Sequence, residues 1–394
     1  MNLIFLGSSC PESVEQELMK LGARMDFPGH TLQNALLAGF SQLTKKINII
    51  TSWGITNFPK VKKICFGRRV MSYGDNKDNY IYVGAFNLPL LDKLYRYLKV
   101  KRELKRMLKN GEDNVLVVYG VQSPFLLAAV AHRKRIKHIN VIVPDLPEFM
   151  SGNTGKLHLF LKKIDHKIIT RCLKKIDSYS LLSEPMQERL PMEGKKWCLM
   201  EGIYQPTEEP ILSEKHPNKV VMYTGGIYHR RGTDLLLEAF KLIDNPDYRL
   251  WIRGNGDMKS EILEMAKSDP RIVYFEPVPR LELLKMEKQA TCMINPTMPS
   301  LDFTRYFFPS KTMEYLASGT PTIMFHLGCM PKEYDEHLFY IENETPESMR
   351  DKIVEVCEMD KDNLADFGRK AQEFVLSEKT PQKQCEKILE LCRQ

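Results

Sequence analysis

A glycine pair and two adjacent arginines stand where an apolar run gives way to a helical pattern. Gly225 and Gly226 end the run, and Arg230 and Arg231 precede a leucine-rich segment that begins after Gly232. Glycines let a backbone approach a ligand closely, and the first turn of a helix offers free N–H groups. This combination suits a diphosphate. The alternative is a pair of solvated arginines at the start of a helix.

A second segment places a cation and a carboxylate in the first turns of another predicted helix. We expect Ser310 to be its N-cap and Gly319 to end it. Lys311 opposes the helix dipole unless an anion binds there, and Glu314 follows one turn later. Both side chains could therefore address one ligand. The alternative is an ion pair between the two on a surface helix.

Short β-rich runs alternate with helical patterns along the whole chain, which is typical of parallel sheets built from βαβ units. In the first half, strands are expected near 2–7, 47–51, 64–71, 79–84, 114–119, 139–143 and 178–182, and helices near 31–44, 90–109, 123–136, 155–175 and 184–190. In the second half, strands are expected near 219–224, 249–253, 272–276, 291–295 and 321–325, and helices near 232–242, 257–268, 280–289, 310–318, 347–358 and beyond 361.

The 394 residues suffice for two α/β domains, and the proline-rich segment 204–210 is the expected linker. We expect a doubly wound first domain over 1–205, a second over 206–375, and a C-terminal helix over 376–394 that packs back on the first domain. Two such sheets would face each other across a ligand-binding cleft. No apolar run is long enough for a spanning helix, and the start reads as a buried strand, so a cytoplasmic protein is expected.

Charge is divided unevenly between the two halves. Residues 1–205 contain 32 Lys and Arg against 18 Asp and Glu, whereas residues 206–394 contain 25 against 32. The predicted helix 90–109 carries eight cations beside an apolar stripe of Leu94, Tyr97, Leu98, Leu104 and Leu108. Such a helix suits an anionic membrane surface, with an ordinary amphipathic helix as the alternative. Nucleic acid is disfavoured because no stripe of aromatic residues accompanies the charge.

Three segments of the second half, in this order and spacing, resemble the C-terminal domain of the family-4 glycosyltransferases. They are the turn over 225–232, the sequence Trp-Ile-Arg-Gly-Asn-Gly over 251–256, and Phe-Pro-Ser-Lys through Gly-Thr-Pro over 308–321. The resemblance implies a GT-B fold, two Rossmann-like domains facing each other across a cleft. It also implies a retaining enzyme that uses a nucleotide diphosphate sugar.

The resemblance also implies roles for single residues. Arg231 takes the place of the usual lysine at the diphosphate, Glu314 holds the ribose hydroxyls, and Asp145 lies near the reacting sugar. Arg231 and Lys311, with Asp145, are the expected catalytic residues. The expected donor-binding residues are Gly225, Gly226, Arg230, Arg231, Gly254, Asn255, Ser310, Lys311, Thr312, Glu314 and Glu333. For Glu333 a structural role is equally expected.

Two positions depart from the family pattern. Gly226 stands where the family has an arginine, and Tyr306 stands where it has a second glutamate. We therefore keep two alternatives to a transferase acting on a glycan or lipid-linked acceptor in cell-surface polysaccharide synthesis. One is a catalytically silent subunit that binds a nucleotide sugar or glycan. The other is a GT-B epimerase of nucleotide sugars.

The remaining expectations concern the acceptor and metals. His30 lies before the predicted helix 31–44, and His30 and Asn34 are candidate acceptor ligands, with a satisfied loop histidine as the alternative. The nine cysteines form no C-x-x-C pair and are expected as reduced thiols, and the histidines have no metal-ligand spacing. We expect no cofactor and no divalent metal requirement, and peripheral attachment at the inner face of the cell membrane.

Overall fold

The chain divides into two compact units, which we describe separately in a computed structural model. Unit 1 comprises residues 1–203 and 381–394, and unit 2 comprises residues 204–380. The structure describes residues 1–21, 27–53, 58–73, 78–88, 91–149, 156–206 and 211–393. Most of the predicted linker, 207–210, therefore lies outside the described residues. In this part of the chain, no helix combines the length and apolar character needed to span a membrane.

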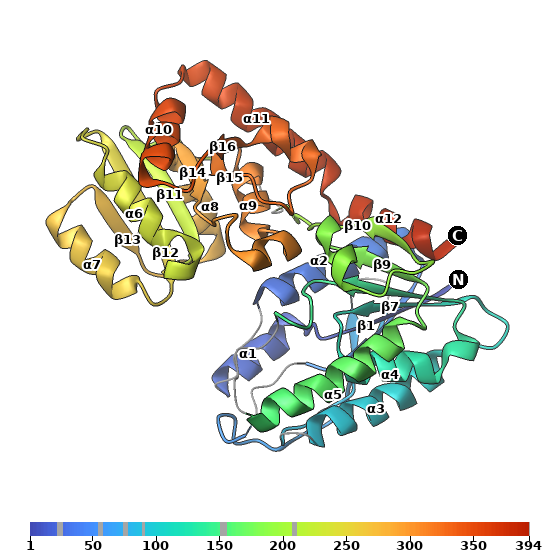
Figure 1. Cartoon of the computed structure of the whole chain (residues 1–394). Helices are drawn as coiled ribbons and strands as arrows, with labels where there is room; N and C mark the ends of the chain where they lie inside the picture. Colours follow the sequence, from blue (N-terminus) through green and yellow to red (C-terminus); the bar gives the residue numbers. More distant parts are fainter. Residues whose placement is uncertain are drawn as a thin grey trace. The chain divides into compact units, whose positions relative to one another are not determined.

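Unit 1 is built on an eight-stranded sheet with the order β10-β9-β8-β7-β1-β2-β5-β4 (Figure 1). All neighbouring strands are parallel except β4 and β5. The strands of this sheet are β1 (Asn2–Gly7), β2 (Ile47–Thr51), β4 (Arg69–Tyr73), β5 (Asp78–Tyr82), β7 (Asn114–Tyr119), β8 (His138–Val143), β9 (Ser178–Leu181) and β10 (Lys196–Leu199). Two short strands, β3 (Cys65–Phe66) and β6 (Ala85–Phe86), pair antiparallel in a separate sheet. The helices of unit 1 are α1 (Glu12–Lys20), α2 (Phe27–Leu43), α3 (Leu91–Met107), α4 (Ser123–Ala131), α5 (Lys156–Leu173) and α12 (Pro381–Arg393).

The C-terminal helix α12 packs against α2 in unit 1. Gly39 of α2 makes the close approach possible, because a Cβ atom there would lie 2.2 Å from the carbonyl oxygen of Pro381. Cys385 Sγ also donates to the carbonyl oxygen of Leu36 at 3.3 Å. The last helix is thereby a structural part of unit 1, although unit 2 precedes it in the sequence.

Unit 2 is built on a parallel six-stranded sheet with the order β13-β12-β11-β14-β15-β16. Its strands are β11 (Lys219–Gly226), β12 (Tyr248–Asn255), β13 (Ile272–Phe275), β14 (Cys292–Asn295), β15 (Thr322–Phe325) and β16 (Phe339–Ile341). Its helices are α6 (Thr233–Lys241), α7 (Lys259–Ser268), α8 (Arg280–Gln289), α9 (Ser310–Ser318), α10 (Pro346–Cys357) and α11 (Lys361–Glu378). Counted along unit 2, this is the order 3-2-1-4-5-6 of a Rossmann fold, which confirms the predicted class.

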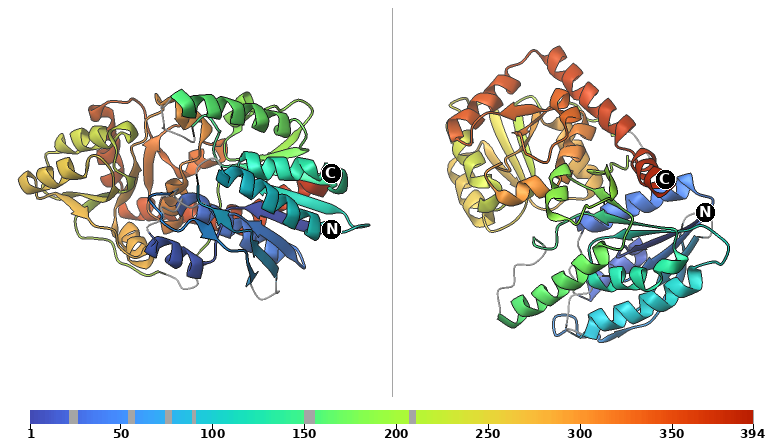
Figure 2. Two further views of the ribbon diagram at one scale, coloured as in Figure 1. Left: turned by 90° about the horizontal axis from the view of Figure 1, so that it is seen from below. Right: turned by 45° about the vertical axis from the view of Figure 1, so that its right-hand side comes forward.

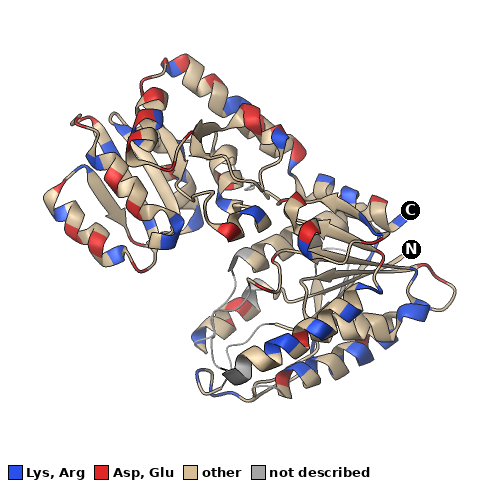
Figure 3. Cartoon of the chain, in the orientation of Figure 1, with Lys and Arg blue, Asp and Glu red and all other residues tan. Residues whose placement is uncertain are grey.

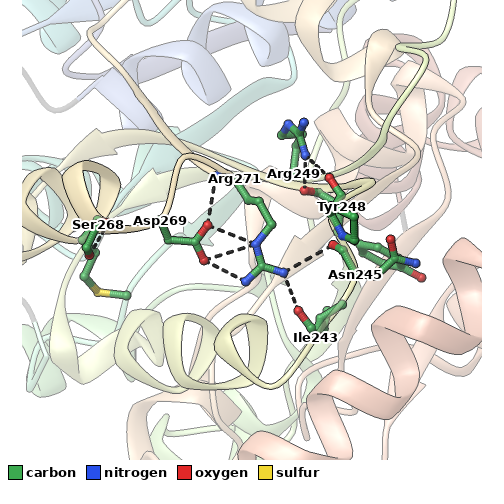
Figure 4. A network of polar contacts seen from close by, with 9 residues as sticks. Ile243, Asn245, Tyr248, Arg249, Ser268, Asp269 and Arg271 are labelled. Atoms are coloured by element: carbon green, nitrogen blue, oxygen red, sulfur yellow. Dashed lines mark hydrogen bonds and ion pairs between the residues drawn. The ribbon is translucent and has the colours of Figure 1, made fainter.

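A polar network fixes the edge of this sheet where β12 and β13 begin. Arg271 forms an ion pair with Asp269 at 2.7 Å and donates to the backbone carbonyls of Ile243 and Asn245, in the loop before β12 (Figure 4). The guanidinium holds the pKa of the Asp269 carboxyl below its usual range through hydrogen bonds and charge. This network lies at the amino ends of the strands and stabilises the sheet from there.

Several sequence-based boundaries need correction. The strand predicted over 64–71 is two short strands, β3 and β4, separated by Gly67 and Arg68, because β3 pairs with β6 and β4 pairs with β5 in different sheets. The helix predicted over 184–190 is a 3₁₀-helix, Glu184–Arg189, which has Pro185 as its second residue and is only 6 residues long. The helix predicted over 31–44 begins earlier, at Phe27, because Pro28 suits the first turn of a helix.

Candidate functional site

The candidate site of unit 2 lies at the carboxyl ends of β11 and β14, where the strand order reverses direction. The sheet continues from β11 to β12 on one side and from β14 to β15 on the other, and α/β folds bind ligands at such a reversal of the strand order. Gly225 and Gly226 end β11 at this point. α9, which carries Lys311 and Glu314, lies between β14 and β15 in the chain.

The turn after β11 contains both arginines and ends at a glycine. His229–Arg231 forms a 3₁₀ turn, and Gly232 follows with a positive φ of 76°. Gly232 must lack a side chain, because a Cβ atom there would lie 2.1 Å from the carbonyl oxygen of Pro296, just beyond β14. This close approach joins the two strand ends at the reversal of the strand order.

Arg231 points back over the glycine pair, whereas Arg230 does not. A Cβ atom on Gly226 would lie 3.8 Å from Cδ of Arg231, and Arg231 Nε is buried with no hydrogen-bond partner among the described residues. Arg230 is exposed, with its guanidinium 5.3 Å from the ring centroid of Tyr228. A buried donor without a partner is costly, so an anion beside Gly226 would satisfy Arg231.

Helix α9 starts one residue away from the predicted cap. Pro309 is the N-cap, Ser310 is the first helical residue, and the Ser310 side chain makes no capping hydrogen bond. The prediction of Ser310 as the N-cap is therefore wrong, since the rigid proline already sets the extended backbone before the helix. The predicted end is confirmed, because Gly319 adopts the left-handed conformation with φ of 77°.

Lys311 and Glu314 form an ion pair on α9, with 2.5 Å between Nζ and Oε2. Their side chains are 36% and 29% exposed, so both remain accessible to a ligand. Thr312, the third residue of this turn, is fully buried and its hydroxyl lies against Met324 Sδ. Of the three, only Lys311 and Glu314 can therefore reach a ligand with their side chains.

The hydroxyl of Tyr315 ties α9 to the end of β11. It donates to the carbonyl oxygen of Thr224 at 2.6 Å and accepts the Thr224 amide N–H at 3.0 Å. Tyr315 is fully buried, and Thr224 immediately precedes Gly225. The contact holds Glu314 and the glycine turn in one fixed arrangement, although they are about 90 residues apart in sequence.

Glu287 is a buried carboxyl at this site that the sequence analysis missed. It belongs to α8 and is fully buried; Oε1 accepts the Thr224 hydroxyl at 3.4 Å, and Oε2 has no partner among the described residues. Burial and the nearby Glu314 charge raise the pKa of Glu287 to about 7. A sequence signal exists, since Glu287 lies three and four residues after Leu284 and Leu283 on the apolar face of α8.

Other donor-site candidates have structural explanations. A Cβ atom on Gly254 would lie 1.8 Å from the carbonyl oxygen of Gly225, so close packing of β11 and β12 requires this glycine. Asn255 is exposed, and its side chain accepts the amide N–H of Gly256. The Glu333 carboxylate binds the ammonium group of Lys379 at 2.6 Å.

The candidates of unit 1 lie on two elements. His30 is within α2, not before it, and is buried; its Nδ1 accepts the Cys10 amide N–H at 3.4 Å, and Nε2 lies 3.0 Å from Asn34 Nδ2 and 3.4 Å from Glu15 Oε2. Asp145 is exposed in the segment after β8. His30 and Asn34 are thus together, and Asp145 is on another element of the unit.

No group of three or more His, Cys, Asp and Glu side chains suited to a metal ion occurs among the described residues. The nine cysteines are free thiols. Tyr306, which stands where a carboxylate was expected from the family pattern, is buried at 3% exposure.

One family model and several solved structures are similar to this chain. The family model described as "Glycosyl transferases group 1" matches residues 218–359, most of unit 2. A search of curated proteins finds no match. Similar solved structures include sucrose-phosphate synthase from Thermosynechococcus elongatus, at 13% identity and a TM-score of 0.64, covering 100% of this chain and 98% of that one.

Two further structures are similar over their whole length. TarM from S. aureus, solved in a complex that includes UDP, aligns at 12% identity and a TM-score of 0.62, covering 100% of both chains. Starch synthase IV from Arabidopsis thaliana, solved with ADP and acarbose, aligns at 8% identity and a TM-score of 0.65, covering 100% of this chain and 99% of that one. The fold class of these proteins, GT-B with two Rossmann-like units, is confirmed for this chain.

Proposed function

We propose that this chain, a glycosyltransferase whose second unit contains a group 1 domain, transfers a sugar from a nucleotide diphosphate sugar to a glycan or lipid-linked acceptor, with retention of anomeric configuration. The observation that carries the proposal is the group of residues at the carboxyl end of β11, where the strand order reverses. There the Gly225–Gly226 backbone, the unsatisfied Arg231 and the Lys311–Glu314 pair lie on elements fixed to one another.

Each part of this group has a role toward the donor. Gly225 and Gly226 let the diphosphate approach the backbone, and Arg231 with Lys311 supplies positive charge beside it. Glu314 accepts hydrogen bonds from the ribose hydroxyls once Lys311 turns to the phosphate. The binding of UDP by TarM and of ADP by starch synthase IV supports this choice of ligand class.

The same charges serve the chemical step. As the bond between the sugar and the diphosphate breaks, negative charge grows on the leaving phosphate, and Arg231 and Lys311 stabilise it. The acceptor hydroxyl attacks from the same face of the sugar and gives its proton to the departing phosphate oxygen. Asp145 is assigned to the reacting sugar in this scheme. Because two cations serve the leaving group, we propose that no divalent metal is required.

Binding of nucleoside diphosphates to a Glu314 variant tests the assignment. Hydrogen bonds to a charged acceptor contribute about 1.5–3 kcal/mol, so Glu314→Ala should weaken the best-bound of UDP, ADP and GDP roughly ten- to a hundred-fold. Isothermal calorimetry measures the change. The control is Glu264→Ala on α7, because Glu264 forms a similar surface pair with Lys267 at 2.7 Å.

The control should bind like the parent protein. If a folded Glu314→Ala protein also keeps the parental dissociation constant, then Glu314 does not bind the ribose and the donor assignment fails. The surface ion pair with Lys311, worth about 0.3–0.5 kcal/mol, would then be its whole role.

The burial of Tyr306 favours a second candidate function. If sugar transfer requires a carboxylate at this position, the chain is instead a catalytically silent subunit that binds a nucleotide sugar or glycan. Analysis of the nucleotide products formed from the donor in the presence of acceptor glycans distinguishes these functions. Transfer releases the diphosphate, a silent subunit releases none, and an epimerase of nucleotide sugars returns an isomerised donor.

We further propose that the protein works in cell-surface polysaccharide synthesis at the inner face of the cell membrane. The support is the charge of residues 1–205, which contain 32 Lys and Arg against 18 Asp and Glu. A lipid-linked acceptor lies in that membrane, so attachment would bring the enzyme to its substrate.

A further inference from the structure

We propose that α3 and α5 of unit 1 together form the docking surface for an anionic lipid bilayer. The exposed large apolar side chains of this α3–α5 face are Leu91, Leu94, Leu98, Leu159, Phe160 and Ile164. The inference rests on the membrane location given above, but not on the donor site of unit 2.

The apolar residues of α3 lie on one side of the helix and face solvent. Leu91, Leu94 and Leu98 are 50%, 55% and 53% exposed, and their spacing of three and four residues places them in one stripe. Val100, on the opposite side, is fully buried. The core of unit 1 therefore does not need the three leucines, which remain available to a partner.

The first turns of α5 also expose large apolar side chains to solvent. Leu159, Phe160 and Ile164 are 45%, 61% and 42% exposed, whereas Ile169, further along the helix, is buried. Six exposed large apolar side chains on two helices are more than the isolated exposed residues of an ordinary surface.

α3 and α5 belong to one layer on the same side of the sheet. Lys93 of α3 forms an ion pair with Asp165 of α5, with 2.9 Å between Nζ and Oδ2. Ser123 of α4 donates to the other oxygen of Asp165 at 2.5 Å, and α4 is largely buried between the two longer helices. Figure 2 shows α5, α4 and α3 in a row, so α3 and α5 flank α4 in one layer.

Cations accompany the apolar side chains on both helices (Figure 3). α3 contains seven Lys and Arg against two acidic residues, and α5 contains five against one. All three acidic residues already bind cations of unit 1: Asp92 binds Arg96, Glu103 binds Arg68 and Arg106, and Asp165 binds Lys93. The exposed cations without an acidic partner among the described residues include Arg102, Lys105, Lys163, Lys167 and Arg171.

This combination fits a bilayer better than a nucleic acid. Lipid headgroups attract the cations, while the acyl boundary beneath them accepts leucine and phenylalanine side chains. A nucleic acid would use the cations but leave the aliphatic side chains in water. The charge of the surface requires a membrane with anionic lipid.

Co-sedimentation of the full chain with lipid vesicles tests the proposal. Binding is measured with phosphatidylcholine vesicles, and with vesicles that also contain phosphatidylglycerol, at increasing salt. We expect binding only to the anionic vesicles, and weaker binding as salt rises, because exposed charges are screened within about 8–10 Å at physiological salt.

Two double variants separate the apolar and the charged contribution. Leu94→Ser with Leu98→Ser should weaken vesicle binding at least about tenfold, because the inserted apolar area is lost. Lys163→Gln with Lys167→Gln should also weaken it at least about tenfold, since each cation near an anionic leaflet contributes about fivefold. The matched controls are Leu263→Ser with Leu281→Ser and Lys241→Gln with Lys285→Gln, all exposed positions of unit 2.

The controls should bind vesicles like the parent protein. The proposal is overturned if neutral vesicles bind equally, if neither vesicle binds, or if the control variants lose as much binding. It is also overturned if the leucine variant binds normally, which would leave a purely electrostatic surface for another polyanion. Calorimetry with nucleoside diphosphates on the same proteins keeps this outcome separate from that of the donor site.

Discussion

Replacing Glu287 by glutamine should change how the stability of unit 2 depends on pH. The carboxyl is fully buried on α8, and one of its oxygens has no partner among the described residues. Burial and the charge of Glu314 raise its pKa, while Lys311, the Thr224 hydroxyl and Arg280 lower it. The balance leaves the pKa at about 7, against an ordinary value of 4.5.

The sign of the effect follows from proton binding in the two states. Between pH 4.5 and 7 the folded protein keeps the proton of Glu287, while the unfolded chain releases it. The free energy of unfolding therefore falls as pH rises through this window. One pKa unit corresponds to about 1.4 kcal/mol, so the fall amounts to about 3 kcal/mol and is complete above the folded-state pKa.

Glu287→Gln removes this dependence because an amide does not ionise. Relative to that of the parent protein, the free energy of unfolding of the variant should rise by about 3 kcal/mol between pH 5 and pH 8. Urea unfolding followed by tryptophan fluorescence measures it, since Trp251 packs in the same core as Met286 of α8. Glu282→Gln is the control, because Glu282 is exposed on the same helix.

The difference in the free energy of unfolding between parent and variant isolates the contribution of Glu287 from that of the other titrating groups. A difference that stays constant from pH 5 to pH 8 would refute the reasoning, because Glu287 would then ionise as an ordinary glutamate. Glu314→Gln adds a second check. Removing this negative charge should lower the pKa of Glu287 and move the pH dependence to lower pH.

The remaining predictions concern two further charges of unit 2. Arg231→Ala should weaken the binding of nucleoside diphosphates by about tenfold or more, because a charged hydrogen bond to phosphate is lost, and should weaken that of nucleosides little. Calorimetry with both ligands measures the two affinity losses, and equal losses would exclude a phosphate contact. Glu333→Gln should lower the free energy of unfolding by about 1–2 kcal/mol, since the buried Lys379 loses the ion pair with Glu333. The affinity for nucleoside diphosphates should stay unchanged, and a large loss of affinity in calorimetry would instead assign Glu333 to the donor site.

The fold class follows from local patterns that the structure confirms. β-rich and helical segments alternate in both units, and the sheet orders are those of Rossmann folds. Gly319 ends α9 as predicted, because a left-handed residue is a local requirement that sequence expresses directly. The start of α9 was placed wrongly, since Ser310 and Pro309 both suit a helix start and only the backbone distinguishes them.

The apolar stripe of α3 shows what sequence periodicity leaves open. Leu94, Leu98, Leu104 and Leu108 belong to one predicted stripe, yet the last two are buried and the first two are exposed. Leu104 lies four residues after the buried Val100, so it is on the buried side of α3, whereas Leu94 and Leu98 lie on the opposite side. The predicted stripe thus combines two sides of the helix, and which side the unit covers depends on contacts between distant segments.

The site depends on such a distant contact. The sequence predicts Glu314 and the glycine turn as separate motifs, and the Tyr315 hydroxyl joins them by binding both backbone groups of Thr224. Glu287 contacts the hydroxyl of the same threonine, and its burial depends on this packing. The charge of Glu287, the position of Glu314 and the shape of the turn are therefore properties of one cluster. Substitutions at Glu287 and Glu314 should then not be additive, because each changes the electrostatic surroundings of the other.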